Sequence, residues 1–350
     1  MKTLKILDWP AFRYNSETHP FYKWHRQLKE RGIETQFFTN HQDPRLNDAD
    51  FLLIHSRYFE HGWQSIAKRT QENEDTLRNL LIGWKKTVGM LLWYDAADST
   101  GSNDFPIIDL VDKFVKKQVF KSTKHYSERS KSLRIWMDGE DRTEIVYPCP
   151  QDQLHKITLG WNIGLNDYRY FGYKMSRLSN YLGYGIYPMK FSAVDKTREL
   201  DVSFRGTVLN HPIAKQRNKV IQLMQTMKQQ RAEAKRLSRK EYFNELRNSK
   251  MCISPYGWGE VCYRDFEIVI SGALLIKPSM DHLSTFPDVY IPHETYIPVS
   301  WELNDLAETV ERSLANYNFA KQIAQNGQDV YRKAVCEPTA FMDAVFRMIS

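Results

Sequence analysis

The chain has 350 residues, of which 42% are hydrophobic and 13% aromatic, and it carries a formal net charge of +7 with a pI near 9.0. A single hydrophobic core stops growing at about 250–300 residues, so this length predicts two domains with a cleft between them. No run approaches the ~18 apolar residues that a membrane-spanning helix needs. The opening residues, with Lys5 inside their apolar run, also lack the pattern of a secretory signal. These features predict a cytoplasmic protein.

The positive charge favours anionic partners, which include nucleotide sugars, anionic membrane surfaces, acidic glycans and nucleic acid. Charge alone does not choose among these classes. The four cysteines, Cys149, Cys252, Cys262 and Cys336, show no CxxC spacing and are expected to be reduced structural thiols.

The first half of the chain shows the alternation of strands and helices that is typical of a parallel α/β domain. Strands are predicted at 3–8, 33–38, 51–54 and 88–94, and helices at 21–31, ended by Gly32, and at 65–85. The segment 111–120 fits either an edge strand or a short helix. Between about 121 and 195 the pattern dissolves, with a tyrosine-rich stretch at 168–187 and an expected linker at 186–198.

The α/β pattern restarts with a strand at 200–204, which turns at Arg205-Gly206-Thr207 and enters a helix near Pro212. A strand at 296–300, a helix at about 304–317 and an amphipathic terminal helix at 339–349 follow later in the chain. No repeat of fixed period is present, which argues against solenoids and propellers.

The most informative stretch runs from Cys252 to Pro278 and predicts a buried strand, a loop with Gly257 and Gly259, and a helix that opens on Arg264 and Glu267. Backbone amides, a cation and a carboxylate converge there at the carboxyl end of a strand and the start of a helix. This is the outline of a nucleotide-diphosphate site.

The motif resembles the C-terminal domain of GT-B glycosyltransferases, especially the exostosin-like and CgeB-like groups, over roughly residues 200–315. It matches at Ser254, Pro255, Gly257, Gly259, Tyr263, Arg264, Glu267 and Gly272. The resemblance implies two Rossmann-like domains facing each other across a cleft, with the C-terminal helix returning to the first domain. The implied boundaries are an acceptor-binding domain at 1–190, a nucleotide-sugar-binding domain at 198–330 and the returning helix at 331–350.

A departing nucleoside diphosphate needs fixed positive charge, for which Arg205 and Arg264 are the candidates. The loop residues Gly206, Thr207, Pro255, Tyr256, Gly257, Trp258 and Gly259, and the helix start at Tyr263, are expected to line the donor site. The resemblance implies that Glu267 accepts the ribose hydroxyls. Glu260 is one residue too close to Glu267 for the Glu-x7-Glu form of related transferases, and His282 is expected near the base or ribose.

A general base is expected at the carboxyl ends of the first domain's strands, where Asp95, Asp98 and His55 lie. If the anomeric configuration is retained, no base is needed.

No metal or other cofactor is expected. Asp48-Ala-Asp50 matches an Asp-x-Asp metal pattern but precedes its strand, whereas a metal site in the cleft would follow one. His282 and His293 lack the helical i, i+4 spacing that presents two ligands to one ion.

The sequence therefore predicts a metal-independent glycosyltransferase that moves a sugar from a nucleotide-sugar donor to a surface glycan or glycolipid, with peripheral contact to an anionic membrane. A GT-B transferase acting on modified DNA bases is one alternative. A non-catalytic nucleic-acid-binding protein is another alternative, in which the tyrosines of 168–187 stack on the bases and the basic segment 231–250 contacts the phosphates. That basic segment also fits a solvated helix face.

Overall fold

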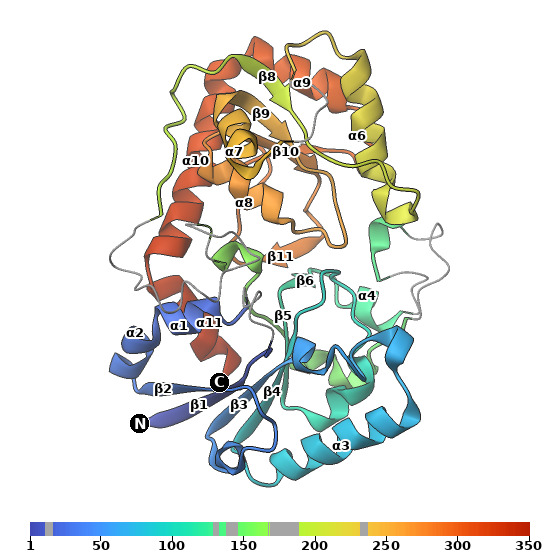
Figure 1. The fold of residues 1–350 in the computed structure, drawn as a ribbon, viewed down its shortest axis with the longest axis vertical. Helices are drawn as coiled ribbons and strands as arrows, with labels where there is room; N and C mark the ends of the chain where they lie inside the picture. Colours follow the sequence, from blue (N-terminus) through green and yellow to red (C-terminus); the bar gives the residue numbers. More distant parts are fainter. Residues whose placement is uncertain (11–16, 129–132, 138–145, 167, 169–188, 232–236) are drawn as a thin grey trace. The chain divides into compact units, whose positions relative to one another are not determined.

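A computed structural model describes residues 1–10, 17–128, 133–137, 146–166, 168, 189–231 and 237–350 (Figure 1). The chain forms two compact units. Unit 1 comprises 1–188, 284–286 and 337–350, and unit 2 comprises 189–283 and 287–336. Most of the predicted tyrosine-rich stretch, part of the predicted linker and part of the basic segment lie outside the described residues.

Unit 1 is built on a six-stranded parallel sheet with the order β2-β1-β3-β4-β5-β7. Its strands are β1 (Lys2–Leu7), β2 (Ile33–Phe38), β3 (Phe51–His55), β4 (Met90–Asp95), β5 (Lys113–Lys116) and β7 (Ile157–Leu159). The four predicted strands are confirmed. The ambiguous 111–120 segment forms β5, which lies inside the sheet between β4 and β7 rather than at an edge. Strand β3 is buried along its whole length, as expected for a strand covered on both faces.

Among the described residues, the α-helices of unit 1 are α1 (His19–Lys23), α2 (His25–Glu30), α3 (Gln71–Lys85), α4 (Lys124–Ser127) and α11 (Thr339–Met348). The predicted 21–31 helix is divided at Trp24, and Gly32 follows it with a φ of +88°. Helix α3 starts later than predicted because Thr70 and Asn73 form a capping box at its N-terminus.

The C-terminal helix α11 lies beside α1 in unit 1 (Figure 1). Phe341 of α11 makes edge contacts with Phe21 and Trp161, with ring centroids 5.1 and 5.0 Å apart, and packs on Trp24. Aromatic burial of this kind therefore returns the end of the chain to the first unit, as the resemblance implies. A short two-stranded sheet pairs β6 (Gln118–Phe120) with β11 (Leu283–Thr285).

Unit 2 contains a four-stranded parallel sheet with the order β12-β10-β9-β8. Its strands are β8 (Leu200–Ser203), β9 (Ser249–Ile253), β10 (Leu274–Pro278) and β12 (Ile297–Val299), and its helices are α6 (Lys215–Thr226), α7 (Arg239–Asn248), α8 (Tyr263–Ile270), α9 (Leu306–Ala315) and α10 (Tyr317–Cys336). Phe266, Val269 and Ile270 of α8 are buried. The long helix α10 was not predicted.

Within the described ranges, no helix combines the length and the apolarity that crossing a bilayer requires.

Candidate functional site

The carboxyl edge of the unit 2 sheet gathers most of the predicted donor residues. Strand β8 leads into Arg205, Gly206 and Thr207, and strand β9 leads into the loop 254–259 and then α8. Parallel strands present their carboxyl ends at one edge, so these loops are neighbours. Gly206, Thr207 and Trp258 are exposed there, whereas Pro255, Tyr256, Gly259 and Glu260 are buried.

Arg264 and Arg217 are the two guanidinium groups of this edge that form no salt bridge with a carboxylate within the described chain. Arg264 donates to the Arg205 carbonyl at 3.0 Å and lies 4.9 Å over the Phe204 ring. Arg217, in the first turn of α6, is partly buried, and its Nε has no hydrogen-bond partner. Burial lowers the pKa of Arg217, and the charge of Arg264 lowers it further. Two unpaired cations held side by side form a ready site for an anion.

Arg217 was missed by sequence reasoning as a site residue. A cation in the first turn of a helix is an ordinary surface feature, and nothing local to α6 signals its proximity to Arg264. The Pro212 helix start that follows the Arg205 turn is the one sequence signal that places Arg217 near the motif.

Arg205 is engaged by a carboxylate rather than unpaired. Its Nε donates to both Glu245 carboxylate oxygens, at 2.9 and 3.1 Å, and Ser203 donates to the same carboxylate at 2.7 Å. The side chain of Arg205 is 17% exposed. This pair fixes the β8 loop, so the Arg205 carbonyl is in place to hold Arg264.

Gly206 is required by close approach. A Cβ at this position would lie 2.6 Å from Phe204 Cζ and 2.9 Å from Arg217 Cγ. The absence of a side chain therefore lets the β8 loop pack against the helix turn that carries Arg217.

Glu267 lies one turn along α8 from Arg264 and accepts a hydrogen bond from the Tyr242 hydroxyl at 2.9 Å. Burial raises the pKa of its carboxyl, against the opposing effects of Tyr242 and Arg264. Ser271, one turn beyond Glu267, is buried at the end of the helix.

A buried ion pair sets the start of α8. Asp265 and Lys277 are fully buried and 3.2 Å apart. Asp265 also accepts from the Cys262 amide at 2.9 Å, the Tyr290 hydroxyl at 2.7 Å and the Ser254 hydroxyl. A buried charge is stable only when it is paired and bonded in this way. The network joins β9, β10 and the first turn of α8, and it orients the turn that carries Arg264.

An aromatic group lines the remaining part of this edge. His282 contacts Trp301 with ring centroids 5.0 Å apart and lies 6.5 Å from Tyr256. Buried Gln216 fastens the loops, because it accepts from the Tyr256 amide and donates to the Trp301 carbonyl, each at 2.9 Å. Trp258 is 56% exposed and lies 5.4 Å from the His211 ring.

In unit 1, Asp95 lies in a buried ion pair. Its carboxylate is 2.6 Å from the Lys116 ammonium, and both side chains are at most 2% exposed. It also accepts from the Ala97 amide at 2.9 Å. The charge of Asp95 is thus neutralised by Lys116 within unit 1, at the carboxyl ends of β4 and β5.

His55 and Asp98 belong to a network of charged side chains at the same edge of the unit 1 sheet. His55 is buried, lies 3.3 Å from the Glu17 carboxylate and has an Nδ1 without a hydrogen-bond partner within the described residues. Lys117 lies 3.6 Å from Glu17 and 3.0 Å from Asp98, which also contacts Arg57 at 3.4 Å. Burial would raise the pKa of Glu17, but the hydrogen bond from His55 and the charge of Lys117 outweigh it and lower that pKa. Among the three predicted candidates for the base, Asp98 is the exposed one, at 46%.

Asp104 gives unit 1 a pH-dependent stability. Burial, together with the charge of Asp95, raises the pKa of Asp104 from 3.8 to about 7. A carboxyl whose folded pKa is raised binds its proton more tightly in the folded state, so its stabilising effect is full below about pH 4 and is lost as the pH rises to about 7. Asp104→Asn keeps an acceptor for the Trp93 indole, which is bonded at 3.1 Å, but does not titrate.

We therefore expect the free energy of unfolding of the wild-type protein to fall relative to that of Asp104→Asn between pH 4 and 7, by on the order of a few kcal/mol. Urea denaturation across this range measures the difference. The matched control is Asp109→Asn, which removes an exposed carboxylate from the same segment. Parallel pH profiles for the wild type and Asp104→Asn would show that the proton is not bound there.

The carboxylates of the Asp48-Ala-Asp50 pattern have partners within unit 1. Asp48 pairs with Lys5, and Asp50 accepts from the Thr3 amide at 2.7 Å. Across the described part of the chain, no three His, Cys, Asp or Glu residues are grouped so as to hold a metal ion.

No protein-family model matches the sequence, and no curated protein matches it. Solved structures do match. An alpha-glucosyltransferase (AGT) in complex with UDP has a TM-score of 0.51 at 8% identity, with 100% of both chains covered. An alpha-glucosyltransferase in complex with UDP and a 13-mer DNA containing an HMU base has a TM-score of 0.50 at 10% identity, with 99% of each chain covered. Anabaena HepE in complex with UDP-glucose has a TM-score of 0.47 at 10% identity, again over 99% of each chain. The chain thus has the fold of GT-B glycosyltransferases, along its whole length.

Proposed function

We propose that the protein is a glycosyltransferase that moves a sugar from a UDP-sugar donor to a glycan or glycolipid acceptor. The observation that carries this proposal is the pair of guanidinium groups, Arg217 and Arg264, which form no salt bridge with a carboxylate in the described chain and lie at the carboxyl edge of the unit 2 sheet. Structures of this fold with bound UDP support the choice of donor.

The two arginines would neutralise the diphosphate as the glycosidic bond breaks. Negative charge grows on the leaving oxygen in that step, and fixed cations stabilise it without reorganisation. In this proposal they act in place of a divalent metal. Glu267, next to Arg264 on α8, would accept the ribose hydroxyls, and the aromatic group around His282 and Trp301 would border the base.

The acceptor is assigned to unit 1, with Asp98 as the candidate base, because its carboxylate is exposed. Lys117 and Arg57 favour the ionised form, which can accept a proton from an attacking hydroxyl. A glycolipid acceptor would place the protein at an anionic membrane surface, for which its charge of +7 is suited.

A modified DNA base is the second candidate acceptor. It is favoured by the basic pI near 9.0 and by the likeness to an alpha-glucosyltransferase bound to DNA that contains an HMU base. Phosphate contacts release counterions, so DNA binding would weaken steeply with added salt, whereas binding of a neutral glycan would not.

A thermal-shift screen with UDP, GDP and CMP tests the donor assignment. We expect UDP to raise the Tm, because a ligand that binds only the folded state stabilises it. The UDP-sugar that is hydrolysed then serves in transfer assays with oligosaccharides and with hydroxymethylated duplex DNA. No shift with any of the three nucleotides, and no hydrolysis of any nucleotide sugar, would contradict the proposal and favour a non-catalytic binding protein.

A further inference from the structure

A cavity in unit 2 lies at the opposite edge of the sheet from the donor loops. It has a volume of about 420 Å³ and is lined by the start of β12, the last turn of α9 and the first turns of α10. Ile297 is the first residue of β12, whereas the donor loops follow the last residues of β8 and β9. The cavity therefore cannot hold the reacting end of the donor.

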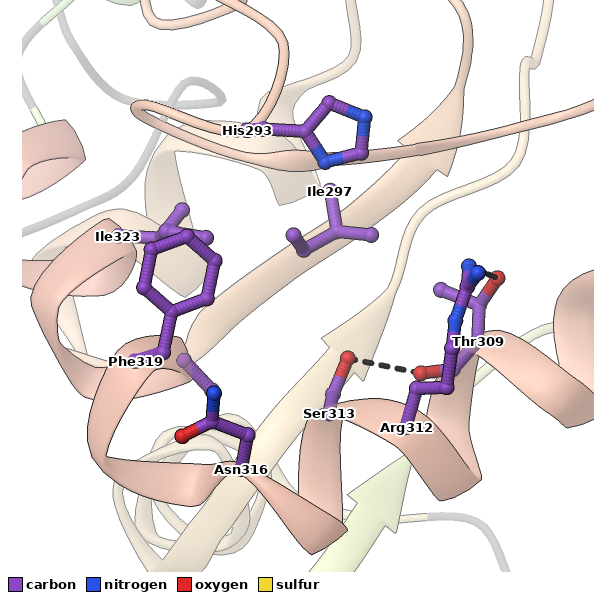
Figure 2. A pocket seen from close by; sticks show the side chains of 9 residues that line it. His293, Ile297, Thr309, Arg312, Ser313, Asn316, Phe319 and Ile323 are labelled. Carbon is purple, nitrogen blue, oxygen red and sulfur yellow. Dashed lines mark hydrogen bonds between the residues drawn. The ribbon is translucent and has the colours of Figure 1, made fainter.

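The cavity has an apolar inner wall and a polar rim. Ile297, Ala320 and Ile323 are at most 8% exposed and form the wall. Figure 2 shows the Phe319 and His293 rings on either side of the space, with Asn316 and Arg312 projecting from the neighbouring helices. Phe319 is 52% exposed, so a large apolar ring is open to solvent rather than packed in the core.

The polar groups of the rim have free hydrogen-bonding capacity. Within the described residues, neither the Asn316 side-chain amide nor the His293 ring makes a hydrogen bond, and the Arg312 guanidinium lies 3.4 Å from the Thr309 hydroxyl and 3.7 Å from the Glu308 carboxylate. His293 adopts a φ of +61°, which is uncommon for a residue other than glycine, and its amide donates to the Tyr296 carbonyl at 2.9 Å. The turn thus holds the imidazole over the cavity at a conformational cost, a pattern that clusters at ligand sites.

We infer that this cavity is a glycan-binding subsite that holds one or two sugar residues of a polymeric acceptor away from the reaction. A pyranose ring has an apolar C–H face and a rim of hydroxyl groups. That pattern matches an exposed Phe319 ring beside amide, guanidinium and imidazole groups. The volume is in the range of about 300–1,000 Å³ that ligand pockets occupy. A diphosphate would need more fixed cations than the single Arg312 supplies, and an acyl chain would make no use of the amide, guanidinium and imidazole groups of the rim.

The position of the subsite specifies the class of acceptor. The subsite and the donor loops lie at opposite ends of the strands of the unit 2 sheet, so the length of one strand, on the order of 15 Å, separates them. A saccharide that occupies the subsite while another of its residues is glycosylated must therefore be a chain of several sugars. This inference rests on the proposed function for its role, but the binding itself can be tested without any transfer.

Isothermal titration with maltohexaose, cellohexaose, chitohexaose and hexagalacturonic acid tests the subsite on the full-length protein. We expect at least one of these to bind the wild-type protein, and Phe319→Ala to bind it about tenfold more weakly through loss of the stacking ring. Phe319→Tyr keeps the ring and should bind as the wild type does. Val330→Ala, at a partly exposed site on the same helix, is the control for truncation of α10.

Two outcomes overturn the inference: none of the four oligosaccharides binds the wild type, or Phe319→Ala binds as tightly as the wild type. The UDP-induced rise in Tm should be unchanged in Phe319→Ala, which separates the subsite from the donor site. If UDP gave no shift while oligosaccharide binding depended on Phe319, the proposed function would fail and the subsite would stand.

Discussion

Replacing Arg264 by alanine is expected to lower the rate of sugar transfer by about 10²–10³-fold, the loss typical of removing one fixed donor to a developing negative charge. The fold should survive, because Arg264 is partly exposed and, among the described residues, its guanidinium donates a hydrogen bond only to the Arg205 carbonyl. Steady-state turnover of the UDP-sugar that the screen identifies, together with the Tm of the variant, measures both effects.

Arg217→Ala is the partner experiment. Removing this cation relieves its repulsion with Arg264 in the free protein, so the variant should be no less stable and yet should bind UDP more weakly. Arg264→Lys keeps the charge but not the planar fork, and is expected to recover part of the activity. Lys228→Ala, which removes an exposed cation of the same unit, controls for net charge. Undiminished turnover in Arg264→Ala would refute the donor-site assignment.

Asp95 and Asp98 are expected to separate into a structural and a chemical role when each is changed to asparagine. Asp95→Asn leaves the Lys116 ammonium buried without its counter-ion, which costs about 3–5 kcal/mol for a buried pair. Asp98→Asn removes a half-exposed carboxylate, so the fold should tolerate it. If Asp98 is the general base, its loss should slow transfer by about 10²–10⁴-fold.

Urea denaturation and single-turnover assays on both variants measure this separation. The pH dependence of the rate supplies a further readout, since loss of a base removes the corresponding acidic limb. A stable Asp95→Asn variant would show that the buried pair contributes little. Full activity in Asp98→Asn would show that Asp98 is not the general base. It would favour a mechanism that retains the anomeric configuration, which needs no base.

Local patterns in the sequence were sufficient to predict most of the central strands of both units. Alternating apolar runs and helix signals predicted β1, β2, β3 and β4, and the motif predicted β9, the glycine loop and α8. These features depend on neighbours within one or two turns of a helix or along one strand, so periodicity and capping residues reveal them. Helix α10 was not predicted although its buried positions recur at helical spacing, because Gly327 and Gln328 stand among them and interrupt the apolar pattern.

The ionic partners were decided by tertiary structure. Asp95 pairs with a lysine 21 residues away, His55 contacts a glutamate 38 residues away, and Arg205 pairs with a glutamate 40 residues away. The sequence by itself determined which charged residues follow the strands and where the glycines allow close approach. Which of those charges are neutralised and which stay available for a ligand depends on side chains brought together from distant strands and helices, because a charge is stabilised by whatever lies within a few ångströms of it in space.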